Sequence, residues 1–196
     1  MKVLTHTDKS LCLRLSKGEV ELPKIIYQNL NLVHLEIYAE ALSSIPQDIC
    51  QLIKLQHLEV NCPQLTTISS GVFVLPELLT LKLKNGTISE LPELQPTCLS
   101  LKNLQLNNNK LTRLPEWLGE LSALELLDLS GNDIAMLPQS MAKLHKLKRL
   151  NLDRNGLKVL PAVVEKLSAL NHLSLDGNDF SEEERERLFQ RFSIWF

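Results

Sequence analysis

The sequence repeats with a period of 23 residues. In the unit 101–123, LKNLQLNNNKLTRLPEWLGELSA, Leu occupies the first, fourth and sixth positions, Asn the ninth, and Leu-Pro the fourteenth and fifteenth. Full units begin at Leu32, Leu55, Leu78, Leu101, Leu124, Leu147 and Leu170. A fixed period of this length indicates a solenoid, in which each coil packs only on its neighbours.

Each unit predicts one short strand. The leucines at positions four and six point to one face of the strand, and positions three, five and seven point to the other. A single strand cannot bury its leucines, so successive units stack into a parallel sheet over a shared leucine core. Asn at position nine ends the strand, since its side chain can bond backbone groups where the chain turns. Leu-Pro then favours a stiff return turn.

Composition excludes several classes of function. The formal net charge of −2 provides no field that favours nucleic acid or an anionic membrane surface. No apolar run reaches the ~18 residues of a membrane helix, and the first residues lack an apolar core of signal-peptide length. The four cysteines form no CxxC pair. We therefore expect a cytoplasmic protein, with secretion into a host cell without a classical signal peptide as the alternative.

The repeats divide the chain into three regions. Residues 1–31 form an N-terminal cap with a degenerate first repeat, in which Leu11, Leu13 and Leu15 lie one residue out of register. Residues 32–180 hold seven units, and residues 181–196 form a C-terminal cap. In that cap we expect a capping box of Ser181 with Glu184, followed by a helix on which Glu183 and Arg187 stand four residues apart. Leu188, Phe189 and Phe192 are expected to cover the core, and 193–196 to add a short strand with Trp195 on the concave side.

The ninth position divides the array in two. It is Asn in the last four units (Asn109, Asn132, Asn155 and Asn178) and Glu40, Pro63 and Gly86 in the first three. Backbone groups that Asn would serve need other partners in the first three units. We therefore expect amide hydrogens before residue 90 to exchange faster than those after it.

The strand positions that face away from the core form a polar strip. Seven strands ~4.8 Å apart give a strip roughly 30 Å long, which suits a modest protein interface. Tyr38 and Leu126 are its candidate anchors. The predicted partner-binding residues are His34, Glu36, Tyr38, His57, Glu59, Lys82, Lys84, Asn103, Gln105, Asn107, Leu126, Asp128, Arg149, Asn151, Asp153, His172 and Asp176.

Three other sites compete with this strip. His34 and His57 are ladder neighbours, as are Glu36 and Glu59, so they could either hold zinc or form a polar ladder without metal. Leu94 and Trp117 could form an apolar patch on the convex side, unless Trp117 packs against its own repeat. Cys62 could pair with His57, although a lone thiol at such a position is more often inert. We predict no metal, no cofactor and no catalytic residue.

The motif resembles that of the leucine-rich repeat family over about residues 10–180. The 23-residue LxxLP form is similar to Ras-suppressor-type and bacterial members, and the tail NxxSEEERERL resembles the end cap of many bacterial members. This resemblance implies an α/β, right-handed, curved solenoid with a parallel sheet on the concave face and short helices or turns on the convex face. Bacterial ubiquitin ligases with such repeats add a catalytic domain with a nucleophilic Cys, whereas this sequence has no Cys after Cys98, so that activity is not expected.

These observations together predict a non-enzymatic module that binds a protein partner on its concave face, and a monomer. A bacterial effector that binds a host protein is one alternative. A structural or self-associating protein that uses the convex face or the N-terminal edge is the other.

Overall fold

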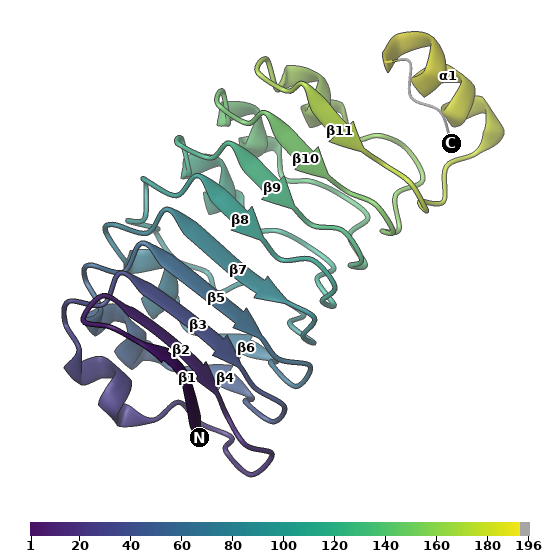
Figure 1. Cartoon of the computed structure of the whole chain (residues 1–196). Coiled ribbons are helices and arrows are strands. Elements are labelled where there is room, and N and C mark those ends of the chain that lie inside the picture. Colours follow the sequence, from purple (N-terminus) through teal and green to yellow (C-terminus); the bar gives the residue numbers. More distant parts are fainter. Residues whose placement is uncertain (193–196) are drawn as a thin grey trace.

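The computed structural model describes residues 1–192, which form a single curved stack of coils (Figure 1). A nine-stranded sheet lines one side, in the order β1-β2-β3-β5-β7-β8-β9-β10-β11. Its strands are β1 (Lys2–His6), β2 (Ser10–Arg14), β3 (His34–Tyr38), β5 (His57–Asn61), β7 (Thr80–Lys84), β8 (Asn103–Gln105), β9 (Leu126–Asp128), β10 (Arg149–Asn151) and β11 (His172–Ser174). A second sheet pairs β4 (Ser44–Ile45) with β6 (Thr67–Ile68).

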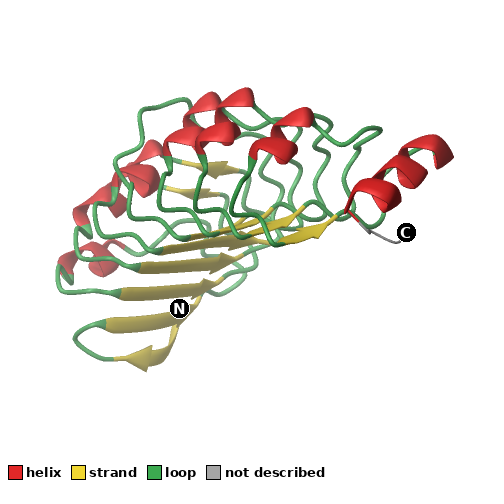
Figure 2. Ribbon diagram, turned by 90° about the horizontal axis from the view of Figure 1, so that it is seen from above, coloured by secondary structure: helices red, strands yellow, loops and turns green. Residues whose placement is uncertain are grey.

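The opposite side carries short 3₁₀ helices, which form a separate layer from the strands (Figure 2). They are η1 (Lys24–Gln28), η2 (Gln47–Gln51), η3 (Ser70–Val74), η4 (Glu116–Glu120), η5 (Gln139–Lys143) and η6 (Ala162–Lys166). Five of the six follow directly on a Pro and the sixth on Ser69, so the Leu-Pro element starts the helix as well as turning the chain. The predicted solenoid is confirmed, with 3₁₀ geometry on the convex side. Within residues 1–192 no helix is both long and apolar enough to cross a membrane.

The 23-residue period sets the register of the sheet. From β3 to β11 every strand is parallel to its neighbour, and residues 23 apart are paired, as in Leu58 with Leu81 and Leu127 with Leu150. The leucines at the first, fourth and sixth positions are buried along the whole array and form one continuous core from the first coil to the last, apart from the half-buried Leu170 and Leu173 of the final unit. The 23-residue period therefore determines both which strands pair and which leucines are buried.

The N-terminal region differs from the repeats in two ways. β1 and β2 form an antiparallel hairpin, which the repeat pattern does not predict. β2 then pairs in parallel with β3 with a spacing of 24 residues, Leu11 opposite Leu35. Leu11, Leu13 and Leu15 are therefore buried in register, and the chain accommodates the offset with one additional residue between the strand and Leu22.

Buried asparagines at the ninth position connect the last four units. Asn132 Nδ2 donates to the carbonyls of Leu106 and Leu129, at 3.0 and 2.8 Å, and its Oδ1 accepts the Leu111 N–H at 3.0 Å. Asn109, Asn155 and Asn178 make the equivalent bonds in their own units. Each side chain thus serves its own coil and the preceding one.

The first three units satisfy their backbone by other means. β3, β5 and β7 are five residues long, whereas β8 to β11 are three, and the second sheet β4–β6 occurs only here among the described residues. The Cys62 thiol donates to the Leu42 carbonyl at 3.2 Å. These partners remove the physical reason for faster exchange before residue 90. We now expect amides of β3, β5 and β7 to be protected as strongly as those of β8 to β10, which hydrogen exchange read by mass spectrometry can measure.

Trp117 on η4 is part of the core. Its side chain is only 6% exposed, its ring lies 4.9 Å from that of Phe73, and its Nε1 donates to the Pro92 carbonyl at 2.9 Å. The hypothesis that Leu94 and Trp117 form an exposed convex patch is therefore wrong. An indole packs inward here because its one polar atom finds a carbonyl of the preceding coil.

Neighbouring 3₁₀ helices approach closely where Gly119 faces Ser140. A Cβ on Gly119 would lie 2.2 Å from the Ser140 carbonyl oxygen, which belongs to the backbone and cannot move away cheaply. We expect Gly119→Ala to lower the free energy of unfolding by about 1–3 kcal/mol, because η4 and η5 must separate. Urea denaturation measures the loss. Gly18→Ala, where no atom lies within 4 Å of the added Cβ, is the control and should leave stability nearly unchanged.

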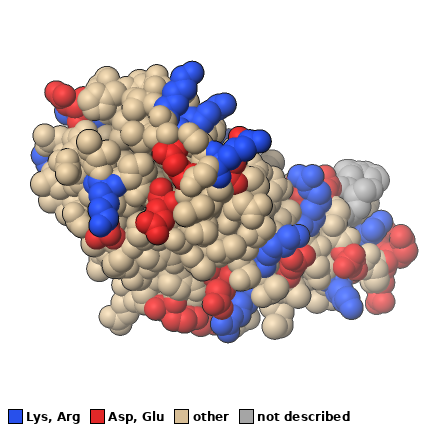
Figure 3. Space-filling model, turned by 90° about the horizontal axis from the view of Figure 1, so that it is seen from below, with Lys and Arg blue, Asp and Glu red and all other residues tan. Residues whose placement is uncertain are grey.

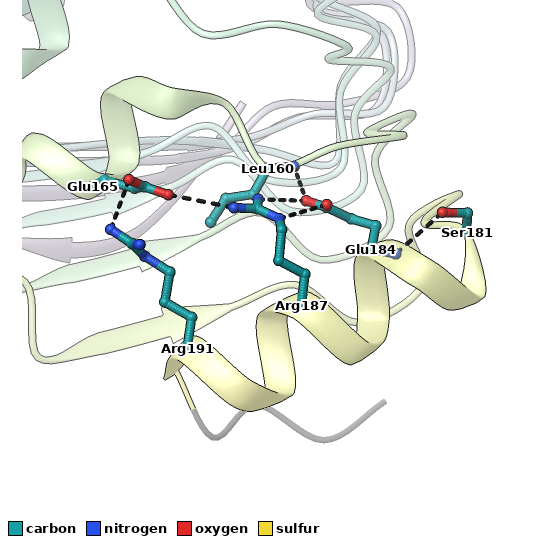
Figure 4. Close-up of polar contacts among 6 residues, drawn as sticks. All are labelled: Leu160, Glu165, Ser181, Glu184, Arg187 and Arg191. Atoms are coloured by element: carbon teal, nitrogen blue, oxygen red, sulfur yellow. Dashed lines mark hydrogen bonds and ion pairs between the residues drawn. The ribbon is translucent and has the colours of Figure 1, made fainter.

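The helix α1 (Glu182–Phe192) ends the described part of the chain. The Glu184 N–H donates to Ser181 Oγ at 3.2 Å, which confirms one half of the predicted capping box. The other half is not formed, because the Glu184 carboxylate instead accepts the Leu160 N–H at 2.9 Å and two bonds from Arg187 at 2.7 Å (Figure 4). Arg187 therefore pairs with Glu184 and with Glu165 rather than with Glu183. Leu188 is buried and Phe189 half-buried, whereas the strand predicted for 193–196 lies outside the described residues.

Candidate protein-binding face

The predicted contact residues share one face of the nine-stranded sheet. Most lie within β3, β5, β7, β8, β9, β10 and β11, and Asn107, Asp153 and Asp176 follow the ends of β8, β10 and β11. All are at least partly exposed. The spacing of the repeats therefore brings together side chains that are up to 142 residues apart in sequence, from His34 to Asp176.

The N-terminal end of this face holds two adjacent groups of polar side chains, which we together call the Tyr38 cluster: Arg14, Glu36 and Tyr38 in one, and Glu59, Lys82 and Lys84 in the other. The Tyr38 hydroxyl donates to Glu36, and the Arg14 guanidinium lies 5.7 Å from the centre of the Tyr38 ring. Glu59 Oε2 accepts a hydrogen bond from Lys82 Nζ at 2.9 Å, and Glu59 Oε1 lies 3.5 Å from Lys84 Nζ. These side chains are largely held in place before any partner arrives.

His34 and His57 border the Tyr38 cluster and stack on each other. Their ring centroids are 4.3 Å apart and the planes differ by 7°. With Ser10, Cys12, Glu36, Glu59 and Lys82 they line a shallow depression of about 260 Å³. This depression is large enough for one side chain of a partner.

The charges of the cluster shift the pKa values of neighbouring groups. The hydrogen bond to Glu36, and then the charge of that carboxylate, raise the pKa of Tyr38 to about 12. Burial, followed by the charge of Glu36, raises the pKa of the Cys12 thiol. Both groups therefore stay protonated at neutral pH, so neither is an activated nucleophile.

The zinc hypothesis for the two histidines does not fit this geometry. The parallel rings present their faces to each other, whereas zinc needs nitrogen atoms that converge tetrahedrally. The two carboxylates are already bonded to Tyr38, Lys82 and Lys84. Across residues 1–192, no group of three His, Cys, Asp or Glu side chains could hold a metal ion.

Cys62 does not pair with His57. The thiol is fully buried and donates to the Leu42 carbonyl, while His57 lies on the exposed side of β5. Cys62 thus fills a core position and supports the backbone, which is the common role of a buried thiol.

At the centre and C-terminal end of the face, aspartate side chains form hydrogen bonds with nearby backbone N–H groups. Asp128 Oδ1 accepts the N–H and hydroxyl of Ser130, at 3.0 and 2.7 Å. Asp153 Oδ1 accepts the Asp176 N–H at 2.8 Å. These carboxylates stabilise the ends of β9 and β11, which leaves less of their bonding capacity for a partner than their spacing alone suggested.

Sequence reasoning missed the contribution of β2. Arg14 and Cys12 join the Tyr38 cluster and the depression because β2 pairs with β3 at a spacing of 24 residues. A strict 23-residue grid places both residues one position away. The signal was present in the alternation Leu11-Cys12-Leu13-Arg14-Leu15, which marks Cys12 and Arg14 as facing away from the core.

The stacked histidines lead to a testable pH dependence. Burial, the charge of His34 and the charge of Lys82 lower the pKa of His57. Because the folded state binds this proton less well than the unfolded state, His57 stabilises the protein above pH ~6.5, and the contribution is lost as the pH falls through its folded pKa. We expect His34→Gln to raise the NMR titration midpoint of His57. An unchanged midpoint would show that the neighbouring ring does not act on His57.

Charged side chains on the adjoining face are mixed in sign. The view in Figure 3 shows Lys and Arg interspersed with Asp and Glu, separated by wide uncharged areas. Elsewhere in the array, opposite charges pair between coils at a spacing of 23 residues, as Lys143 does with Glu120 and Lys148 with Glu125. On the face in view, no broad block of positive charge of the kind that binds nucleic acid is present.

Comparison with known proteins supports the reading of the fold. A family model described as "Leucine-rich repeat region" matches residues 96–189. The Arabidopsis thaliana receptor kinase GASSHO1/SCHENGEN3, whose LRR ectodomain was crystallised in complex with CASPARIAN STRIP INTEGRITY FACTOR 2, is 31% identical over 86% of this chain, with a TM-score of 0.69. The Leptospira interrogans LRR protein LIC12759 is 27% identical over 89% of this chain, with a TM-score of 0.54. The PEPR1–AtPEP1 structure has a TM-score of 0.75 at 24% identity over 94% of this chain.

The chain spans only part of these proteins, namely 22%, 56% and 28% of their respective lengths. A search of curated proteins found no match. The repeat pattern, the register of the sheet, the family model and the solved structures nevertheless agree, and the chain belongs to the leucine-rich repeat proteins.

Proposed function

We propose that this chain is a non-enzymatic interaction module that binds a protein or peptide partner on its concave face, with the Tyr38 cluster as the main contact. The proposal rests on one observation: the side chains of that cluster already hold one another in place before a partner binds. Tyr38 is held by Glu36 and Arg14, and Lys82 and Lys84 by Glu59. Side chains that are already ordered lose little conformational entropy on binding, so more of the contact energy appears as affinity.

Two further observations support this proposal. Tyr and Arg are enriched among the residues that dominate binding energy, and here they lie together beside a depression that can admit a partner side chain. The GASSHO1/SCHENGEN3 ectodomain was crystallised with a bound factor, which shows that a related solenoid holds a ligand. The rigid sheet predicts little backbone movement on binding.

Affinity capture with a matched pair of variants tests the proposal. Wild type, Tyr38→Ala/Lys84→Ala and the control Met136→Ala/Val159→Ala, whose residues are exposed but lie off the sheet, are immobilised and exposed to the same lysate. We expect at least one protein to be retained by wild type and control and lost from the concave variant. For that protein, affinity should fall roughly 10- to 100-fold in the concave variant.

Folding must be matched before the comparison is read, so all three proteins should melt within a few degrees of one another. The proposal is rejected if the same proteins bind equally to all three, or if binding is lost only from the control.

A further inference from the structure

Large apolar side chains gather on the surface at the N-terminal end of the solenoid. Of the ten that are well exposed in the described residues, six lie within residues 1–30. Ile25 is 63% exposed and Val3 47%. Single exposed apolar residues are ordinary, but such a concentration at one end marks a contact surface.

Three of these six side chains border an apolar depression of about 370 Å³. Met1, Val3 and Ile25 stand at its rim, and the core residues Leu11, Leu13 and Ile26 line it. The Met1 ammonium is 2.6 Å from Glu19, which holds the first residue at the rim. The depression is thus the end of the leucine core, which β1 covers only in part.

The strand beside the depression has a free edge. β1 is the outermost strand of the nine-stranded sheet and, within residues 1–192, pairs with β2 alone, on one side (Figure 1). A two-fold axis at this edge would place β1 antiparallel to the β1 of a second copy, which is the arrangement that such an isologous contact requires. Within Lys2–His6, Lys2 is the only residue with a formal charge, so no block of like charges opposes the contact.

The exposed area sets the expected strength of the contact. With ~100 Å² for each fully exposed aliphatic side chain, the exposed fractions of Met1, Val3 and Ile25, which border the depression, amount to roughly 160 Å² of apolar surface. If apolar atoms make up a little over half of an interface, two copies would bury about 560 Å² in total. This area is below the ~1,200 Å² of a stable specific interface and indicates a weak dimer.

We propose that a second copy of this chain covers the depression, and that the protein forms a weak N-terminus-to-N-terminus dimer through β1 and Ile25. The irregularity between Val3 and Thr5 shortens the ladder that two β1 strands can form, so the apolar contacts supply most of the affinity. The two sheets would continue into each other and leave both concave faces open. This inference replaces the expectation of a monomer, and it is independent of the proposed function.

Sedimentation velocity from about 2 to 500 μM tests the dimer. We expect the weight-average sedimentation coefficient of wild type to rise toward that of a dimer over this range. Ile25→Lys should weaken the dimer at least tenfold, because the charge would be buried at the contact. Val159→Lys, at a residue that is 62% exposed elsewhere in the array, should behave as wild type.

Val3→Lys is the second variant and should act like Ile25→Lys, so that the inference remains testable if one of the two fails to fold. Circular dichroism melting verifies the fold of each. A sedimentation coefficient that stays at the monomer value up to the highest concentration overturns the inference. Association that persists unchanged in both lysine variants, or that is lost in Val159→Lys, overturns it as well.

Discussion

Replacing Asn132 with Ala is expected to lower the free energy of unfolding by about 3–5 kcal/mol. The side chain is buried and bonds the carbonyls of Leu106 and Leu129 and the N–H of Leu111. Alanine removes every partner at once and leaves three backbone groups in the core without water. Each such group costs ~1–3 kcal/mol, offset in part by local relaxation.

Urea denaturation at pH 7 measures this loss. Asn171→Ala, at an exposed position of the same array, is the control and should change stability by no more than ~0.5 kcal/mol. Asn132→Asp keeps the shape of the side chain but removes its Nδ2 donor. Oδ1 can still accept a hydrogen bond, whereas the two bonds from Nδ2 are lost. This variant should be at least as destabilising as the alanine variant. A loss below ~1 kcal/mol for Asn132→Ala would mean that water or backbone adjustment replaces the asparagine.

Glu184→Ala is expected to destabilise the C-terminal end by about 2–4 kcal/mol. The carboxylate is nearly buried and joins three parts of the chain, since it accepts bonds from Leu160 and Arg187 while Arg187 also reaches Glu165 (Figure 4). Alanine leaves the Leu160 N–H without a partner. The loss is below that for a fully buried ion pair, because Arg187 is partly exposed and keeps Glu165.

Glu184 should also make the free energy of unfolding depend on pH in the acidic range. The bonds from Arg187 hold the pKa of Glu184 below its ordinary value of 4.5. A carboxyl with a lowered folded pKa stabilises the protein above its unfolded pKa, and this contribution is lost as the pH falls through the folded value. Wild type should therefore lose more stability between pH 5 and pH 2 than Glu184→Gln. Glu186→Gln, on an exposed part of α1, should follow wild type. Parallel pH profiles for wild type and Glu184→Gln would contradict the assignment.

Sequence periodicity was sufficient for the repeats but not for the ends. Between Leu32 and Leu175 each strand has the same neighbours, so spacing alone determines register and which side chains face the core. The β1–β2 hairpin has no counterpart to compare with, and an insertion of one residue after β2 moved Arg14 into the candidate face without a change in the pattern. The sheet face and most side chains of the Tyr38 cluster were thus predicted, whereas the position of Arg14 beside them was found only in three dimensions.

Side-chain partners were harder to predict than backbone pairing. Glu184 satisfies the sequence rule for a capping box, yet its carboxylate binds the Leu160 N–H, which lies 24 residues earlier. Trp117 is on the convex side of its unit, but the carbonyl of Pro92 and the ring of Phe73 draw it inward. In both cases the side chain binds a group of the preceding coil instead of a partner close in sequence. A sequence pattern does not show how near such a group lies in space.

The bonds of the buried asparagines extend back by one coil and no further. A segment the length of 101–123, inserted in frame between two of the last units, would meet the same carbonyls and N–H groups on both sides as the segment it copies. Gene duplication can therefore lengthen such a protein by ~4.8 Å of sheet at a time while both ends keep their contacts. Over evolution, the span of the inner wall can be matched to a larger or smaller ligand without redesign of any coil.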